Sequence, residues 1–220
     1  MRAWLGASGI DPSSLDFEAL EKFVDDLYVQ NKLVNLTAVP REEAELRHLI
    51  DSLAVLGLMP IGATVLDIGT GAGFPAWPLA WARHDLKVVA MDSTAKRLRF
   101  IERHPLPNLA TMLGRAEEVT QPGSFDVVTG RAVAPLGAHA EVSAGWLAPD
   151  GLFIPYRTPH EFRLIDEIDL SALGLKLESV HEIELPDSDI VRLFPVFRKV
   201  APMVSGYPRP WVEIKNHPLG

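Results

Sequence analysis

The chain has 220 residues and contains no cysteine. Disulfide bonds and cysteine-ligated metal sites are therefore excluded, and the composition suits a reducing compartment. The seven histidines show no spacing that is typical of metal ligands, so the sequence predicts no metal site.

Long apolar segments are missing as well. No stretch reaches the roughly 18 uncharged apolar residues that a membrane-spanning helix needs, and residues 1–6 lack the apolar core of a secretion signal. We therefore expect a cytoplasmic protein without membrane contact, and we favour a monomer. A formal net charge of −8 argues against a generally basic surface, although it leaves room for a local basic patch that binds nucleic acid.

What is present is an ordinary globular mixture, with 47% hydrophobic and 23% charged residues. The length suits one catalytic domain with a smaller addition. We predict an N-terminal helical extension over residues 1–60 and an α/β domain over 61–201. A tail over 202–220, which contains four prolines, is expected to be irregular.

The N-terminal extension shows two helical patterns. Apolar residues recur at helical spacing over 15–31, where Ser13 and Ser14 are candidate caps. A second helix is expected over 41–57, with leucines and Ile50 along one face and two glutamates in its first turn.

From residue 63 onward the sequence pattern predicts a strand, a turn and a helix that repeat along the chain. This alternation predicts βαβ units and an α/β fold with a mostly parallel sheet. Short apolar runs mark the strands at 64–66, 87–91, 126–129 and 152–154. Two later runs, 175–185 and 191–200, are close enough to pair antiparallel, and Pro195 predicts a bulge or a shortened strand in the second.

A glycine-rich turn follows the first of these strands. Residues 71–76 fit the dinucleotide-binding pattern G-x-G-x-x-A. Taken from Asp67 to Gly73, the same turn fits the acid followed by G-x-G-x-G of class I methyltransferases, which adds one glycine and one acid to the match. An acid there can accept hydrogen bonds around a bound amino acid but would repel a pyrophosphate. We favour the methyltransferase interpretation, while a nicotinamide enzyme and a turn without a ligand stay open.

Further candidate site residues follow the next three strands. Asp92 ends the second strand, about 20 residues after the glycines, where an acid can bind the ribose of either cofactor. Residues 114–118 follow a third strand, a natural place to contact an adenine, and Arg131 follows the fourth. Because ligands of open α/β sheets bind beyond the carboxyl ends of the strands, we expect these residues to meet at one edge.

Taken together, the motifs resemble the RsmG (GidB) family of ribosomal RNA small-subunit methyltransferases G, over roughly residues 20–200. The ordered set is Asn35-Leu36-Thr37, Arg47 to Ser52, Asp67 to Pro75, Asp92 to Arg97, Gly114 to Glu117 and Arg131 to Ala134. The resemblance implies a class I S-adenosylmethionine-dependent methyltransferase: a Rossmann-like, mostly parallel seven-stranded sheet with one antiparallel strand, plus N-terminal helices. It also implies formation of N7-methylguanine in the 530 loop of 16S rRNA, with the small ribosomal subunit as partner.

The resemblance also implies the site residues. It places the cofactor on Gly69, Gly71, Phe74, Asp92, Ser93, Ala116, Glu117 and Arg131, and the loop pattern adds Asp67. Arg131 is the candidate catalytic residue near the methyl-transfer centre; the alternative is an arginine that pairs with a neighbouring carboxylate. For RNA contacts we expect Arg47, His48, Lys96, Arg97, Arg115 and Arg157.

The implied reaction requires no removal of a proton from the acceptor. N7 of guanine carries a lone pair and no proton, so methyl transfer to it requires positioning and electrostatics rather than a general base. Methyl transfer to C5 of cytosine, by contrast, usually requires a cysteine nucleophile, which this chain lacks.

The chain departs from the family pattern in places. Tyr156-Arg157-Thr158 stand where the family usually has Lys-Gly, so that Arg157 would have to supply the positive charge. Two alternatives therefore stay open. One is a class I methyltransferase that acts on a small molecule, which the acidic balance favours, and the other is a nonenzymatic ribosome-binding relative.

Overall fold

A computed structural model describes all 220 residues and contains one seven-stranded sheet in the order β3-β2-β1-β4-β5-β7-β6. The strands are β1 (Thr64–Ile68), β2 (Lys87–Asp92), β3 (Leu109–Leu113), β4 (Phe125–Gly130), β5 (Leu147–Pro155), β6 (Leu175–Glu184) and β7 (Val191–Lys199). Neighbours among β1 to β5 pair in parallel, whereas β7 is antiparallel to both β5 and β6. The predicted class I architecture, with one antiparallel strand in a mostly parallel sheet, is confirmed.

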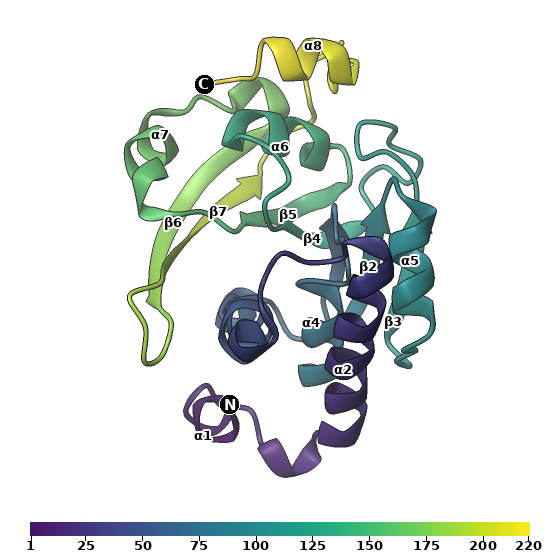
Figure 1. Cartoon of the computed structure of the whole chain (residues 1–220). Coiled ribbons are helices and arrows are strands. Elements are labelled where there is room, and N and C mark those ends of the chain that lie inside the picture. The colour runs from purple at the N-terminus through teal and green to yellow at the C-terminus, as the bar shows by residue number, and fades with distance from the viewer.

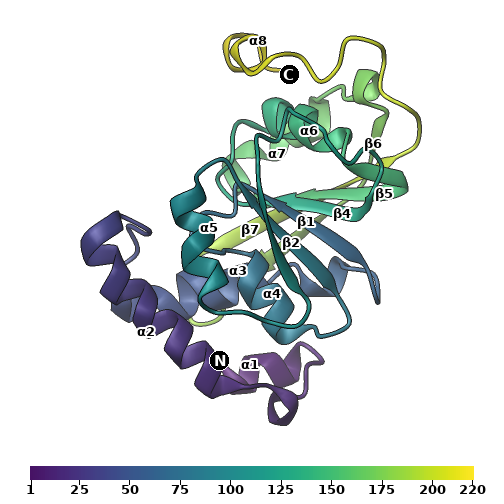
Figure 2. The ribbon, with the colours of Figure 1, turned by 90° about the vertical axis from the view of Figure 1, so that its right-hand side faces the viewer.

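Helices cover both faces of this sheet because successive strand residues point to opposite sides. In β1, Val65 lies in one buried core while its neighbours Leu66 and Ile68 lie in the other. The N-terminal helices lie on one side together with α4 (Ala76–Ala82) and α5 (Ala95–Glu102), and the other side carries α6 (Leu136–Ala144) and α7 (Phe162–Glu167), as Figures 1 and 2 show. Three single 3-10 turns lie outside these helices, at Pro12–Ser14, Pro159–Glu161 and Ser171–Leu173.

The N-terminal helices α1 (Arg2–Ala7) and α2 (Phe17–Val34) belong to the main core rather than standing apart from it. Phe23 of α2 stacks on Trp77 of α4 with ring centroids 4.1 Å apart. The predicted helix at 15–31 is confirmed, but its predicted cap is wrong: the side chain of Asp16 accepts the N–H of Ala19, so the acid next to the helix takes the capping position.

The second predicted helix, 41–57, is helical but not one helix. It consists of a 3-10 turn (Arg41–Glu43), a π-helical segment (Glu45–Ile50), the short α3 (Asp51–Leu53) and a 3-10 turn (Leu56–Leu58). Its apolar face is buried as the spacing predicts. π-helical turns are rare and are often found at functional sites. This one carries Arg47 to Ile50 of the motif, and α3 carries Asp51 and Ser52.

Pro195 does not shorten β7, which runs unbroken through it, and the register shift lies in β6 between Leu177 and Ser179. The effect of Pro195 is on the ladder to β5. That ladder pairs Phe153 with Phe197 and resumes where Arg157 pairs with Leu193, so the same register places Pro155 opposite Pro195. Neither proline has an N–H to donate, and the ladder is interrupted between them.

The C-terminal tail is more ordered than expected. It contains a helix, α8 (Trp211–Asn216), which lies over α6 (Figure 1). Glu141 on α6 is fully buried and accepts hydrogen bonds from the backbone N–H and the guanidinium of Arg209, at 2.7 to 2.9 Å. This ion pair fixes the tail onto the domain, a contact that the proline content of the tail could not predict.

Candidate functional site

A cavity of about 240 Å³ opens at the carboxyl edge of the parallel strands. Five of the residues predicted to hold a cofactor line it: Gly69, Asp92, Ser93, Ala116 and Glu117. Val133, Val142 and Trp211 complete its apolar wall. The structure thus brings together residues that are up to 142 positions apart in the chain, and we call this space the cofactor cavity.

The glycine turn between β1 and α4 explains why three glycines are present. Gly69, Gly71 and Gly73 have φ angles of 69°, 60° and 98°, in the left-handed region that side-chain-bearing residues rarely adopt. A Cβ on Gly73 would also lie 3.3 Å from atoms of Ile101 and Trp77. The turn therefore requires glycine for its backbone shape and, at Gly73, for close packing.

Asp92 ties the turn to the next strand. Its carboxylate is 3% exposed and accepts hydrogen bonds from the N–H groups of Gly71 (3.1 Å) and Thr94 (2.8 Å) and from Arg97 (3.3 Å). The acid at the end of β2 thus joins the glycine turn to the start of α5, and it also lines the cofactor cavity.

Asp67 lies deeper. It is fully buried, and its Oδ2 accepts the N–H of Ala76, while its Oδ1 has no hydrogen-bond partner. Burial raises the pKa of Asp67 to about 7. Asp67 therefore does not line the cofactor cavity but holds the start of α4 behind the glycine turn.

Arg131, the candidate catalytic residue, is held by a buried carboxylate. Its guanidinium donates to Oδ2 of Asp51 (3.0 Å) and to the carbonyl of Arg47 (2.8 Å). Arg192 on β7 donates to both oxygens of the same carboxylate, at 2.7 and 3.0 Å. Asp51 is 2% exposed, whereas the side chains of Arg131 and Arg192 are 19% and 22% exposed. Pairing with a carboxylate, the alternative role, is thus observed, and it leaves part of Arg131 open to a ligand.

His48 supports the same arginine from the π-helical turn. Its Nδ1 lies 3.3 Å from a guanidinium nitrogen of Arg131, and its Nε2 lies 2.7 Å from the hydroxyl of Thr37. Because arginine only donates, Nδ1 must accept, and the ring is neutral with its proton on Nε2. Burial, helped by the charge of Arg131, lowers the pKa of His48 to about 4. The ring also stacks on Phe74, at 4.2 Å between centroids.

The segment Asn35-Leu36-Thr37 acts through this histidine. The side chain of Asn31 accepts the N–H groups of Leu36 and Thr37 and donates to the carbonyl of Thr37, which fixes the loop. The motif therefore belongs to the support of Arg131 rather than to the cofactor cavity.

The predicted RNA contacts divide into two groups. Arg47, Lys96, Arg97 and Arg115 are exposed. Arg115 lines the cofactor cavity, and Arg97 contacts its lining residue Asp92. His48 and Arg157 are 4% and 7% exposed, so both predicted RNA contacts lie inside the protein in this structure.

Arg157 is occupied inside the protein. Its guanidinium donates to Nδ1 of His139 (2.8 Å), to the carbonyl of Ala134 (2.9 Å) and to Glu161 (3.3 Å). The preceding Tyr156 is buried and donates its hydroxyl to the carbonyl of Ser52. The segment that replaces Lys-Gly therefore joins β5 to its neighbours instead of presenting charge.

Sequence reasoning missed three residues of the site: Asp51, Arg192 and Trp211. Asp51 lies within the motif Arg47 to Ser52, and its charge in an otherwise apolar helix face was an available signal. Arg192 and Trp211 gave none, because only the tertiary fold brings β7 and the tail to this edge.

No group of three or more histidine, aspartate and glutamate side chains is placed to hold a metal ion. None of the helices combines the length and the apolar character needed to cross a membrane.

Comparisons with known proteins agree with this geometry. The GidB family model, described as rRNA small subunit methyltransferase G, matches residues 16–191. The ribosomal RNA small subunit methyltransferase G of Lachnoclostridium phytofermentans is 38% identical over 218 residues, which covers 93% of this chain and 90% of the relative. That of Lactobacillus helveticus is 35% identical over 217 residues and covers 90% and 88%.

Solved structures share the fold at low identity. The chains of a Haloferax volcanii complex between the Trm112 methyltransferase activator and a methyltransferase include a match with a TM-score of 0.57 and 18% identity, covering 73% of this chain and 93% of that one. A TehB-like SAM-dependent methyltransferase from Corynebacterium glutamicum has a TM-score of 0.54 and 17% identity, covering 80% and 98%. The family match and the extent of the curated relatives lead to one conclusion: the chain belongs to the GidB family of rRNA small subunit methyltransferases G and is an S-adenosylmethionine-dependent methyltransferase.

Proposed function

We propose that this enzyme forms N7-methylguanine in the 530 loop of 16S rRNA, in the cytoplasm. The observation that carries the proposal is the position of Arg131, held by Asp51 beside the glycine turn and still partly exposed. The names of the relatives, which specify small-subunit rRNA, support the target.

The residues of the cofactor cavity fit S-adenosylmethionine. Asp92 is in place to accept ribose hydroxyls, and Ala116, Glu117 and Trp211 form walls that suit an adenine. Gly69 is exposed, so its backbone can approach the amino-acid part of the ligand. When bound, the cofactor supplies an electrophilic methyl group.

The acceptor chemistry suits the protonation states of the site. N7 of guanine needs no base, and the histidine that contacts Arg131, His48, is neutral and has both ring nitrogens occupied. Arg131 is the group that we assign to hold the guanine or the cofactor in line, because its charge and planar fork suit oriented hydrogen bonds. A guanine in a folded loop must be splayed out to reach this position.

For contacts to the RNA backbone we propose the exposed cations Arg47, Lys96, Arg97 and Arg115. Arg115 lines the cofactor cavity, and Arg97 donates a hydrogen bond to Asp92, which also lines it. The backbone carbonyl of Arg47 accepts a hydrogen bond from Arg131. Lys96 is the fourth exposed cation of this set. Phosphate contacts from such cations position RNA without reading its sequence.

The test is methyl transfer from labelled S-adenosylmethionine to purified small subunits, naked 16S rRNA and a small-molecule extract. Label in a single guanine of the rRNA, at N7, supports the proposal. Label confined to small molecules sinks it and supports the alternative that the acidic balance and the burial of Arg157 favour. Comparison of intact subunits with naked rRNA identifies the form of the substrate.

A further inference from the structure

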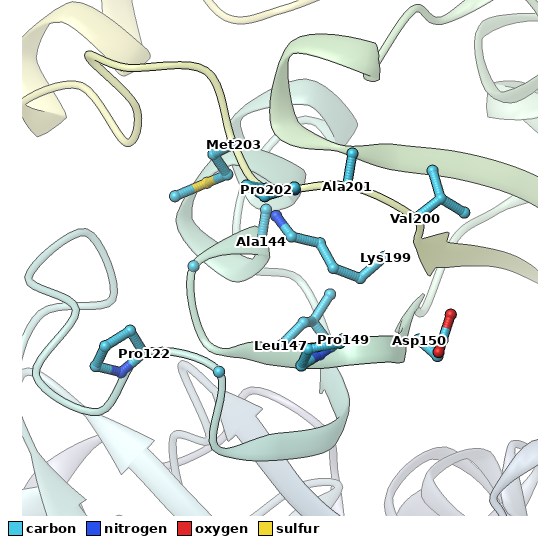
Figure 3. A pocket seen from close by; sticks show the side chains of 12 residues that line it. Pro122, Ala144, Leu147, Pro149, Asp150, Lys199, Val200, Ala201, Pro202 and Met203 are labelled. Atoms are coloured by element: carbon cyan, nitrogen blue, oxygen red, sulfur yellow. The ribbon is translucent and has the colours of Figure 1, made fainter.

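A second cavity, of about 550 Å³, lies at the other edge of the sheet, where β4 and β5 begin and β7 ends. We call it the distal cavity. Its walls are largely apolar, with Leu147, Val200 and Met203 among the lining residues, and only Lys199 and Asp150 of the 12 carry a charge. Figure 3 shows the side chain of Lys199 in the centre of this space.

Lys199 is buried without a counter-ion. The residue is 8% exposed, and its ammonium donates one hydrogen bond, 2.6 Å long, to the carbonyl of Leu173. An ammonium has three N–H donors, so two are left without a protein acceptor. In Figure 3 the side-chain nitrogen of Lys199 points towards Ala144 and Pro202.

No other charged group compensates Lys199. The carboxylate of Asp150 lies at the right of the view, away from the ammonium (Figure 3), and the backbone carbonyl of Asp150 accepts a hydrogen bond from Arg198. Arg198 is itself paired with Glu178 on β6. Burial alone lowers the pKa of Lys199 to about 8, so the ammonium is mostly charged at neutral pH. A buried charge of this kind is costly unless something pairs with it.

We propose that the distal cavity binds a small amphipathic carboxylate. Its head group takes the two free donors of Lys199, and its alkyl or aromatic body lies against Leu147 and Met203. One negative charge matches the single cation of the cavity, whereas a phosphate monoester would bring a second negative charge that no group there could face. Apolar walls with one convergent polar group are the usual composition of a small-molecule site.

The probe is octanoate, compared with octanol and octylamine, which have the same chain and different charge. Isothermal titration of the full-length protein should show octanoate binding at least about tenfold more tightly than octanol, with octylamine weakest; tenfold corresponds to about 1.4 kcal/mol, within the range for a hydrogen-bonded charged group. Octanoate affinity should fall as the pH rises above 8, where Lys199 loses its proton.

Lys199→Met keeps the apolar stem and removes the charge. In this variant octanoate and octanol should bind alike, while affinity for S-adenosylhomocysteine, measured in parallel, stays as in the wild type and shows that the fold is intact. The proposal is overturned if wild-type protein binds octanoate no better than octanol, binds neither, or if Lys199→Met keeps the preference. Because the wild-type comparison needs no variant, it decides the matter even if Lys199→Met fails to fold.

Discussion

At the carboxyl edge of the parallel strands, buried Asp51 is shared by Arg131 and Arg192, whereas at the opposite edge buried Lys199 has no charged partner. The first edge also satisfies Asp92 with three donors. Both edges have a cavity, but only at the carboxyl edge does the protein itself organise the charges around it.

Paired and unpaired buried charges have different consequences for ligand binding. A charge that is paired by the protein keeps its geometry before a ligand arrives, which is what in-line transfer requires. A charge left unpaired destabilises the empty protein and gains most from a ligand of opposite sign.

Arg131→Ala should have the largest effect on catalysis at the carboxyl edge. We expect methyl transfer to fall by roughly 10²–10³-fold, the range seen when one oriented donor is removed from a reaction centre. Single-turnover transfer from labelled S-adenosylmethionine measures it. Arg131→Lys is the matched variant, and it should recover little because it keeps the charge without the planar fork. Unchanged turnover in Arg131→Ala would refute the assigned role.

Asp51→Asn should cost about 3 kcal/mol in the free energy of unfolding, because two guanidinium groups lose their shared buried counter-ion. Urea denaturation at pH 7 measures the loss. Asp150→Asn is the matched control: that carboxylate is exposed and lies at the distal cavity, so the change should stay within about 0.5 kcal/mol. Equal effects of the two variants would contradict the contrast between the edges.

Lys199→Met should instead stabilise the empty protein, by about 2 kcal/mol at pH 7. This is less than the pKa shift alone implies, because solvent in the open cavity screens part of the charge. The pKa of folded Lys199 is lowered to about 8 from 10.5, so between these values the unfolded chain binds more protons and stability rises with pH. Below pH 8 the full penalty of the charged form is present, and the variant removes it. Lys176→Met, at an exposed position of β6, is the control and should change little.

Trp211→Ala should weaken S-adenosylhomocysteine binding about five- to tenfold, the value of one aromatic contact. Its side chain closes the cofactor cavity from the tail, which Arg209 fixes to Glu141. Trp211→Phe should keep most of the affinity, and titration calorimetry measures both. If the alanine variant binds as the wild type does, the tail covers the cavity without contributing to it.

The sequence predicts most of the carboxyl edge because that edge is built from local motifs. The turn from Asp67 to Gly73 requires glycine at positive φ, so its residue types report its shape directly. The alternation of strands and helices in the α/β domain likewise predicts the sheet, and Asp92 follows from its place at a strand end.

The rest depends on contacts that have no local signature. Arg157 carries a charge typical of the surface, yet His139 and Glu161 hold it inside. Trp211 and Arg192 reach the site from elements that lie far along the chain. The distal cavity could not be predicted at all, because Lys199 is buried only by the packing of β7, α6 and the start of the tail around it.

The smallest effect is expected in the pH dependence of wild-type stability, where two groups at the carboxyl edge oppose each other. The pKa of folded His48 is lowered from 6.5 to about 4, so in this window the unfolded chain binds the extra proton and stability rises with pH. The pKa of folded Asp67 is raised from 3.8 to about 7, so the folded chain binds the extra proton and stability falls with pH.

Each group contributes about 1.4 kcal/mol per pH unit, and between pH 4.5 and 6 the two contributions should nearly cancel. Single variants separate them. In Asp67→Asn the slope of the unfolding free energy against pH should become more positive than in the wild type by about this amount, and in His48→Gln more negative. Urea denaturation at four pH values in that range measures the slopes. If both variants keep the wild-type slope, neither group titrates as its burial implies. Lys199 does not affect stability in this range, because its contribution to the pH dependence falls between pH 8 and 10.5. The unfolding free energy therefore reports on the carboxyl edge at acid pH and on the distal cavity at alkaline pH.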